Sequence, residues 1–296
     1  MQIGIASKVY RGERAALYAA LLCQSLSSVT AACVPAETES RSRSESRSGT
    51  FSVLTYNVAG LPQGISESQP LRNMPLISSR LNDFDLVLTQ EDFYYAKALR
   101  RDATHRYYAP RSFDGLLGDG LSRFSRFPMR EVDHQAWKTC HGFLRHASDC
   151  LTPKGFSFAR HILSSFVMVD VYDLHADAGN TAGDQEARSK QIDQLIHYIV
   201  EHSHGQAVII AGDTNLSHRR PRDMATMQRL LQLGFTDACR SLSCGKERID
   251  RILFRGSTQI SLQATRYQVE VQRFSINGVP LSDHQAISVA FRWQTR

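Results

Sequence analysis

Polar residues that can bind a cation or transfer a proton stand at the ends of apolar segments of this sequence. They are Asn57, Glu91, His175, Asp213, Asn215, Asp250, Asp283 and His284. Carboxylate and amide oxygens suit a hard cation such as Mg²⁺, and a histidine paired with an aspartate suits general acid–base chemistry. Strand ends are where α/β proteins place reacting groups, because the sheet is rigid and the loops admit substrate. The set therefore indicates one catalytic site around a cation.

Each of these residues also has a purely structural explanation when it is taken alone. Asn57 lies before Gly60 and Pro62 and could form a turn. Glu91 could open a helix over 92–101, where it would face the positive end of the helix dipole. The others could be loop, ion-pair or helix-capping residues. Their joint occurrence at strand ends favours the shared site.

The segments that must position these residues alternate between strand and helix patterns. Strand patterns cover 51–58, 85–89, 165–174, 207–211, 249–254 and 286–293, with a β-rich stretch over 260–274. Helical spacing covers 71–81, 92–101, 184–202 and 223–233. The run 207–211 is continuously apolar, which is typical of a strand buried on both faces. This order predicts the sheet layers of an α/β or α+β protein.

The polar residues belong to an ordered series of short motifs. The series is TYNVAGLP (55–62), TQED (89–92), LHADAG (174–179), AGDTN (211–215), IDRILF (249–254) and SDH (282–284). It resembles the endonuclease/exonuclease/phosphatase superfamily, and as an ordered set it is specific. The resemblance implies a four-layer α/β/β/α sandwich of two mixed β-sheets flanked by helices, and a metal-dependent hydrolase of phosphoric diesters.

Two further segments are similar to bacterial neutral sphingomyelinase-type phospholipases C. They are GDGLSRFSRFPM (118–129) and KGFSFARH (154–161), the second just after Cys150. This similarity implies a phosphate-binding role for Lys154. The chain departs from the family pattern at Asp92, Thr214 and Arg251. None of these departures removes a catalytic group, and Arg251, in place of the family's usual Tyr, is expected to alter the floor of the cleft.

Phosphodiester hydrolysis needs a hard cation, a base that activates water, and a group that stabilises the departing oxygen. We expect Glu91, with help from Asn57, to hold Mg²⁺, with Mn²⁺ or Co²⁺ as alternatives. The resemblance adds Asp283 as a further carboxylate on the metal side. We predict His284 as the general base, with Asp250 fixing its tautomer.

Three other residues complete the predicted site. We expect Asp213 and Asn215 to orient the attacking water and a phosphate oxygen. His175 would donate to the phosphate or to the leaving group.

Composition and charge agree with a globular enzyme that has an anionic partner. The chain has 296 residues, with 42% hydrophobic and 22% charged, and nothing in this composition suggests a fibre or a multi-pass membrane protein. The formal net charge is +6, which favours phospholipid head groups or nucleic acid as partners. Part of this excess lies near the N-terminus, and no concentrated Lys/Arg stripe interleaved with aromatics runs across the motifs.

The N-terminal region predicts export. Early basic residues, an apolar stretch over 15–23 and small residues before Cys33 form a pattern typical of a secretory signal over 1–33. The first interpretation is cleavage of the signal near Ala31 or Ala32, and the second is lipidation of Cys33. The alternative to export is that this segment forms an amphipathic helix of a cytoplasmic enzyme. Residues 34–49 are predicted to form a Ser/Arg/Glu linker, and 50–296 the catalytic domain.

Four cysteines remain beyond the predicted signal. Cys140 with Cys150 and Cys239 with Cys244 are the simplest disulfides in an oxidising compartment. Their spacing fits no zinc pattern. Four isolated buried thiols are the alternative if the protein is not exported.

The sequence supports several functions that share one chemistry. The leading hypothesis is an exported sphingomyelinase-like phospholipase C that acts on a phospholipid at a membrane surface, as a monomer. A secreted DNase-like endonuclease and a phosphoinositide or sugar-phosphate phosphatase are alternatives. A non-catalytic binding module on the same fold is a more distant one, because such a descendant would be expected to have lost some of the motif residues.

Overall fold

The computed structural model describes residues 47–64, 68–112, 118–142, 149–246 and 248–296. The predicted signal over 1–33 and most of the predicted linker over 34–49 lie outside these ranges. Within them, none of the helices combines the length and the apolar character needed to cross a membrane.

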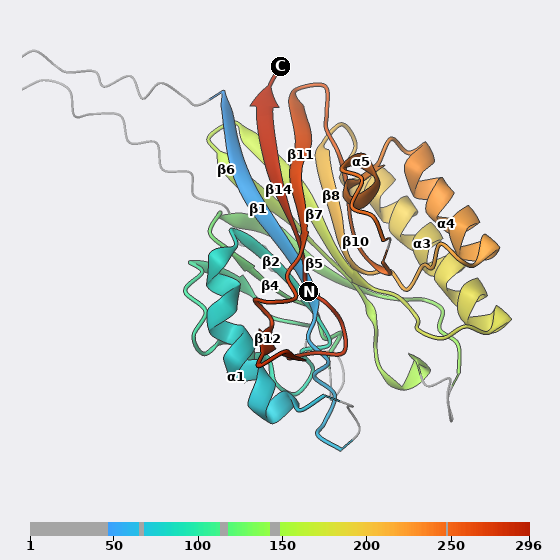
Figure 1. The fold of residues 1–296 in the computed structure, drawn as a ribbon. Helices are drawn as coiled ribbons and strands as arrows, with labels where there is room; N and C mark the ends of the chain where they lie inside the picture. The colour runs from blue at the N-terminus through green and yellow to red at the C-terminus, as the bar shows by residue number, and fades with distance from the viewer. Residues whose placement is uncertain (1–46, 65–67, 113–117, 143–148, 247) are drawn as a thin grey trace, which may run out of the picture. The chain divides into compact units, whose positions relative to one another are not determined.

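Two six-stranded sheets form the centre of the described fold (Figure 1). The first sheet has the order β11-β14-β1-β2-β4-β3, with strands Ile260–Val269, Ile287–Thr295, Ser48–Asn57, Leu86–Gln90, Ser122–Ser125 and Tyr107–Ala109. The second has the order β5-β6-β7-β8-β10-β9, with strands Met129–Ala136, Gly155–Ser164, Val167–His175, Ala207–Asp213, Asp250–Arg255 and Thr236–Asp237. The pairs β1–β2 and β7–β8 are parallel, and the other pairs are antiparallel. Both sheets are therefore mixed.

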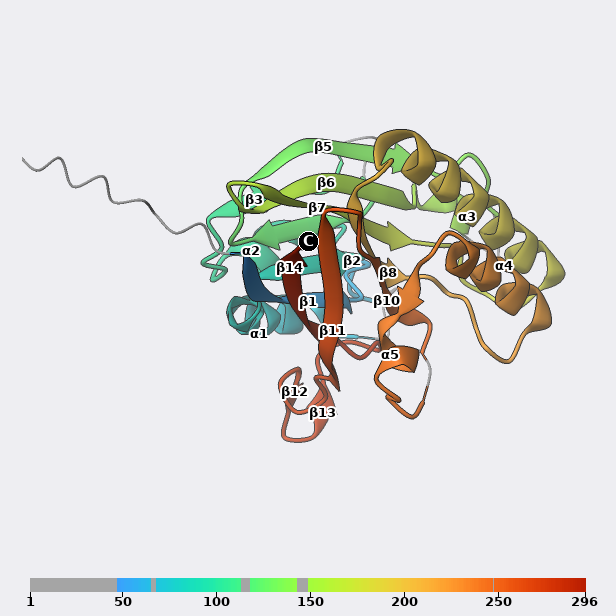
Figure 2. The same ribbon diagram turned by 90° about the horizontal axis from the view of Figure 1, so that it is seen from above.

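Helices cover the outer face of each sheet (Figure 2). Helices α1 (Pro70–Arg80) and α2 (Ala96–Arg100) pack on the first sheet, and α3 (Ala182–His202) and α4 (Pro221–Gln232) on the second. Short helix α5 (Ala238–Ser241) follows β9, a small hairpin of β12 (Ser275–Ile276) and β13 (Val279–Pro280) precedes β14, and 3-10 turns occupy Leu81–Asp83 and Asp149–Leu151. The predicted four-layer α/β/β/α sandwich is confirmed.

Side-chain alternation along the strands explains why the sheets stack. In β1, Phe51 and Val53 point into the core between the sheets, whereas Leu54 and Tyr56 point toward α1. In β8, Ile209 faces the other sheet and Ile210 faces the helices. Burying each such side chain contributes about 1.5–3 kcal/mol. The prediction that 207–211 is buried on both faces is confirmed.

The long helix α3 begins where its sequence signals a start. The Thr181 side chain accepts from the backbone of Asp184, and the Asp184 carboxylate accepts from the backbone of Thr181, which makes a capping box. From there Ile192, Leu195 and Ile199 follow at helical spacing and are fully buried against the second sheet.

Two predicted elements are shorter than their patterns indicated. The helix predicted over 92–101 begins only at Ala96, because the backbone N–H of Asp92 donates to Gly120 O and the chain turns at Glu91, where φ is 61°. The β-rich stretch over 260–274 ends at Val269. Phe274 then folds back into the core, with its ring centroid 4.7 Å from that of Tyr56.

Two disulfides join the predicted cysteine pairs, Cys140 with Cys150 and Cys239 with Cys244. The prediction of local pairing is confirmed. Disulfides persist in oxidising compartments and are rare in the cytosol, so they are typical of a protein that works outside the cytoplasm.

Candidate active site

The two sheets bring the polar strand ends to one edge of the sandwich. Parallel pairing of β1 and β2 sets Asn57 opposite Gln90, so that Glu91 follows at the same edge. In the second sheet the register pairs His175 with Asp213, and Asp213 in turn with Asp250. Residues far apart in the chain therefore meet because of sheet register.

Asp213 links the two sheets within this cluster. Asn57 Nδ2 donates to Glu91 Oε1 at 3.0 Å and to Asp213 Oδ2 at 3.3 Å. His175 Nε2 lies 3.5 Å from Glu91 Oε1 and 3.7 Å from Asp213 Oδ2. These four side chains form a compact group of oxygen and nitrogen donors.

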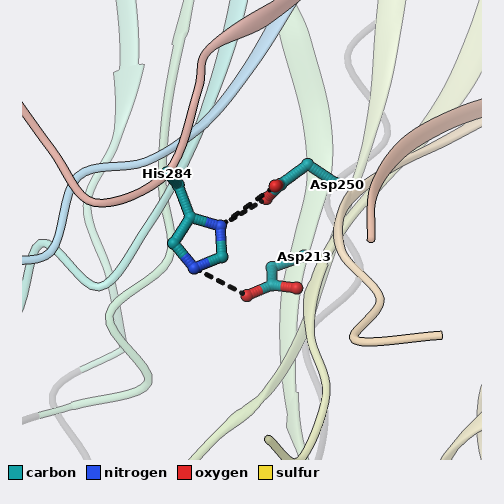
Figure 3. A group of neighbouring side chains, drawn as sticks. All are labelled: Asp213, Asp250 and His284. Carbon is teal, nitrogen blue, oxygen red and sulfur yellow. Dashed lines mark hydrogen bonds and ion pairs between the residues drawn. The ribbon is translucent and has the colours of Figure 1, made fainter. Parts of the chain in front are cut away.

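His284 lies between two carboxylates (Figure 3). Its Nδ1 is 3.0 Å from both carboxylate oxygens of Asp250, and its Nε2 is 3.7 Å from Asp213 Oδ2. The ligand atoms of these three residues lie within 4.8 Å of one another. The His284 side chain is 21% exposed, whereas Asp213 and Asp250 are buried. The imidazole thus presents one nitrogen to a buried partner and the other toward the cluster.

Burial and like charge raise the pKa values of two carboxylates in the cluster, those of Glu91 and Asp213. Burial raises the pKa of Glu91. Burial, and then the charge of Asp250, raises the pKa of Asp213 to about 6. Both effects disfavour ionised carboxylates unless positive charge is present. A divalent cation at this position would supply that charge.

The two histidines respond to the site in opposite directions. Burial lowers the pKa of His175 well below its ordinary value. Burial also acts to lower the pKa of His284, but the bond to Asp250 and the charges of Asp213 and Asp283 outweigh it and raise the pKa to about 10. The neighbouring carboxylates therefore favour the protonated form of His284.

Local backbone geometry aims the side chains that leave β8. Gly212 has φ 140°, and a Cβ at this position would lie 2.0 Å from Leu174 O, so β7 and β8 can approach only with glycine there. The Asn215 N–H donates to Asp213 Oδ1 at 3.0 Å, and Asn215 Nδ2 donates to Ala176 O at 3.0 Å. Asn215 thus forms the turn that its sequence allowed and still lies beside the cluster.

Asp283 and Lys154 lie at the border of the cluster. Asp283 is exposed, and its Oδ1 accepts from Ser282 Oγ at 3.2 Å. Lys154 Nζ pairs with Asp149 Oδ1 at 2.5 Å. The charge of Lys154 also acts on Glu91, His175 and Asp213, so the amine is within electrostatic range of the site.

The sequence interpretation missed the residues that hold the loops in place. Arg188 in α3 has a fully buried guanidinium, whose Nη1 donates to the carbonyl oxygens of Asp177, Ala178 and Gly179 at 2.9–3.0 Å. These carbonyls belong to the loop that follows His175. The signal was present, because Arg188 falls at helical spacing on the apolar stripe that continues through Ile192.

The donors fit a hard divalent cation. The carboxylates of Glu91 and Asp213 offer oxygen atoms, which Mg²⁺ prefers. The amide of Asn57 directs its nitrogen toward both carboxylates, and its Oδ1 accepts from the backbone N–H of Ala59 at 3.1 Å. The cysteines described lie in disulfides, so the site has none of the thiolates that favour softer metals.

The fold and the cluster are those of a DNase-like α/β sandwich hydrolase. A sequence profile of the Endonuclease/Exonuclease/phosphatase family matches residues 54–284, and the chain belongs to this family.

A curated relative agrees with this membership, and solved structures share the fold. The sphingomyelinase of Mycobacterium tuberculosis is 33% identical over 272 residues, which cover 83% of this chain and 53% of the relative. The chain thus spans about half the length of that relative. TDP2 of D. rerio, solved with a single-strand DNA product, superposes with a TM-score of 0.65 at 20% identity, covering 82% of this chain and 99% of the other. Beta toxin from Staphylococcus aureus with bound magnesium ions superposes with a TM-score of 0.60 at 15% identity, covering 81% and 99%.

Proposed function

We propose that this protein is an exported, Mg²⁺-dependent phosphodiesterase of the sphingomyelinase type, which hydrolyses a phospholipid as a phospholipase C. The observation that carries the proposal is the placement of His284, held by Asp250, next to the donor cluster that Asp213 shares with Glu91. The 33% identity to a sphingomyelinase, over 83% of the chain, supports the choice of substrate class.

In this mechanism Glu91 and Asn57 would hold the cation, and Asp283, at the border of the cluster, would add a further carboxylate on the metal side. Bound Mg²⁺ would neutralise phosphate oxygens and offset the carboxylate field that raises the pKa of His284. His284 Nε2 takes a proton from the attacking water, while Asp250 keeps the other ring nitrogen protonated.

The remaining residues act on the phosphate and the leaving group. Asp213 and Asn215 orient the water as its oxygen forms the new bond to phosphorus. The bond from phosphorus to the lipid alcohol breaks, and His175, uncharged because of its burial, donates a hydrogen bond to the departing oxygen. That oxygen takes its proton from solvent. Lys154 adds positive charge on the phosphate side.

A substrate panel tests this proposal. Labelled sphingomyelin in mixed micelles, plasmid DNA, a phosphoinositide and a soluble phosphodiester are each incubated with Mg²⁺ and with EDTA. We expect turnover of sphingomyelin that EDTA abolishes. Nicking of DNA without lipid turnover would instead support a secreted DNase-like nuclease, for which the net charge of +6 is the favourable observation. Phosphoinositide turnover would support the phosphatase alternative, and ligand binding without turnover a binding module.

The proposal includes export as a monomer. The two disulfides and the signal-like sequence over 1–33 support export. N-terminal sequencing of protein from the medium and the periplasm should give a chain that begins after Ala31 or Ala32. Labelling by a fatty acid would indicate instead a lipoprotein anchored through Cys33. Light scattering on the purified protein measures the oligomeric state.

A further inference from the structure

A groove of about 1070 Å³ lies beside the β2–α2 connection, apart from the catalytic cluster. Tyr94, Tyr95 and Tyr108 contribute aromatic rings to its wall. Basic residues from α2 and from the segment after β3 contribute the rest of its polar lining, and among the described residues that line it none is acidic. The sequence interpretation missed this feature, because residues 94–101 and 108–111 come together only in the fold.

The groove is close to the catalytic cluster without being part of it. Tyr94 is three residues beyond Glu91, which follows the end of β2. The Tyr95 hydroxyl accepts from the backbone N–H of Gln63, in the loop that follows Asn57 at the end of β1. A ligand bound in the groove would therefore hold the protein at a point close to the catalytic cluster. The catalytic side chains would remain free to bind substrate.

The charge of the groove selects an anionic ligand. Residues 94–111 carry five basic residues and one acidic residue, Asp102. Asp102 pairs with Arg101 at 2.8 Å, but both side chains are largely exposed, and such pairs contribute little. A concentration of cations repels a choline group, so this groove does not fit the cationic end of a choline lipid. It fits phosphate groups that carry net negative charge.

The state of the tyrosine rings decides between two kinds of anionic partner. The guanidinium of Arg100 covers the Tyr108 ring at 4.4 Å from its centroid, and Phe124 packs against the same ring at 4.9 Å. Tyr95 is half-buried, whereas Tyr94 is 52% exposed. Binding single-stranded nucleic acid relies on successive bases stacking on open rings. With one ring open, the groove favours a phosphate surface without bases.

We propose that this groove binds the head groups of anionic phospholipids and docks the protein on an anionic lipid surface. The inference rests on the proposed lipid phosphodiesterase function and adds a second, non-catalytic lipid site to it. Basic side chains near an anionic membrane add attraction that falls off within a Debye length. Tyrosine suits the same boundary, since its ring is apolar and its hydroxyl polar.

The test measures vesicle binding in the presence of EDTA, so that no turnover is needed. The groove variant is Lys97→Glu/Arg101→Glu, whose two positions are exposed on and just after α2. The control is Arg266→Glu/Arg292→Glu, with the same change in charge at exposed positions on β11 and β14. These two strands lie at one edge of the first sheet, and β3 lies at the opposite edge. Cosedimentation uses vesicles of phosphatidylcholine, with and without phosphatidylglycerol, and a single-stranded oligonucleotide serves as competitor.

We expect the unmodified protein to prefer vesicles that contain phosphatidylglycerol, and the groove variant to bind them about tenfold or more weakly. The control variant should lose much less, and both variants should hydrolyse a soluble phosphodiester at the normal rate. Equal loss in both variants, or no preference for phosphatidylglycerol, would overturn the inference. The oligonucleotide could also compete with vesicles for the unmodified and control proteins but not for the groove variant. That result would assign the groove to nucleic acid. Failure of sphingomyelin turnover alone would leave the vesicle result intact and would count against the proposed function only.

Discussion

Arg188 and Asp223 form a buried ion pair, with Arg188 Nε 3.2 Å from Asp223 Oδ1 and side-chain exposures of 0% and 1%. The pair joins α3 to the first turn of α4. Asp223 Oδ2 also accepts from the backbone N–H of Ser217 and from Arg220, whose Nη2 donates to Asn215 O at 2.7 Å. One network thus holds the loop after His175 and the loop that contains Asn215.

Arg188→Ala should therefore damage both stability and turnover. Removing one partner of a buried ion pair leaves an uncompensated charge, which costs about 3–5 kcal/mol. Urea unfolding measures this loss of stability. The value of kcat measures how far displacement of the two loops lowers turnover. Arg188→Lys keeps the charge but cannot reach all three carbonyls, so it should recover part of the stability and less of kcat. Arg219→Ala, an exposed arginine of the same region, is the control, and an equal loss there would refute the network's role.

His284→Ala should reduce turnover without unfolding the protein. A positioned acid or base contributes roughly 10²- to 10⁴-fold, and the side chain is partly exposed, so little packing is lost. Steady-state kinetics with Mg²⁺ and a melting curve followed by circular dichroism measure the two quantities. His204→Ala, at an exposed position beyond α3, should leave both unchanged. Activity of His284→Ala close to that of the unmodified protein would show that another group is the base.

Mg²⁺ should stabilise the folded chain through Glu91. A ligand at about 100 times its Kd stabilises by about 2.7 kcal/mol, which corresponds to roughly 5–10 °C in Tm for a chain of this size. Calorimetry with Mg²⁺ and with EDTA measures this shift. Glu91→Ala should abolish both the shift and turnover, while Glu186→Ala, which removes a half-exposed carboxylate, should keep them. A full shift in Glu91→Ala would place the cation elsewhere.

His161 should make the protein less stable as pH falls. Burial, and then the charge of Arg123, lowers its pKa well below the ordinary value of 6.5. Below about pH 6.5 His161 therefore binds a proton in the unfolded chain but stays neutral in the folded chain. The free energy of unfolding decreases on acidification for this reason. The slope from this group is at most about 1.4 kcal/mol per pH unit.

Comparison with His161→Gln isolates this contribution, because the other titrating groups are shared. Urea unfolding between about pH 7 and about pH 5 should give a steeper fall for the unmodified protein than for His161→Gln. The variant can be less stable at neutral pH without affecting the comparison of slopes. Parallel curves for the two proteins would show that His161 takes up its proton in the folded state.

Local patterns predicted the elements that carry the site, and they failed where a long-range contact intervened. Helix α3 was predicted over 184–202 from its apolar spacing, which lies within a few turns, and the structure adds the Thr181 cap that starts it at Ala182. The start of α2 was not, because Asp92 bonds to Gly120, which is distant in sequence. The groove beside Tyr94 was missed for the same reason. Its second side is formed by β3 and the segment after it, which lie outside the segment that forms the first side.

The sequence by itself determined which groups are available: the ordered motifs with their carboxylates, amides and imidazoles, the strand periodicity, and the local cysteine pairs. Periodicity and motif order act over a few residues, so they can be read from the chain directly. Tertiary structure decided that Asp213 lies between Asn57 and His284, and that Arg188 is buried under the loops it holds. These relationships depend on sheet register and on the stacking of two sheets, which no short stretch of sequence encodes.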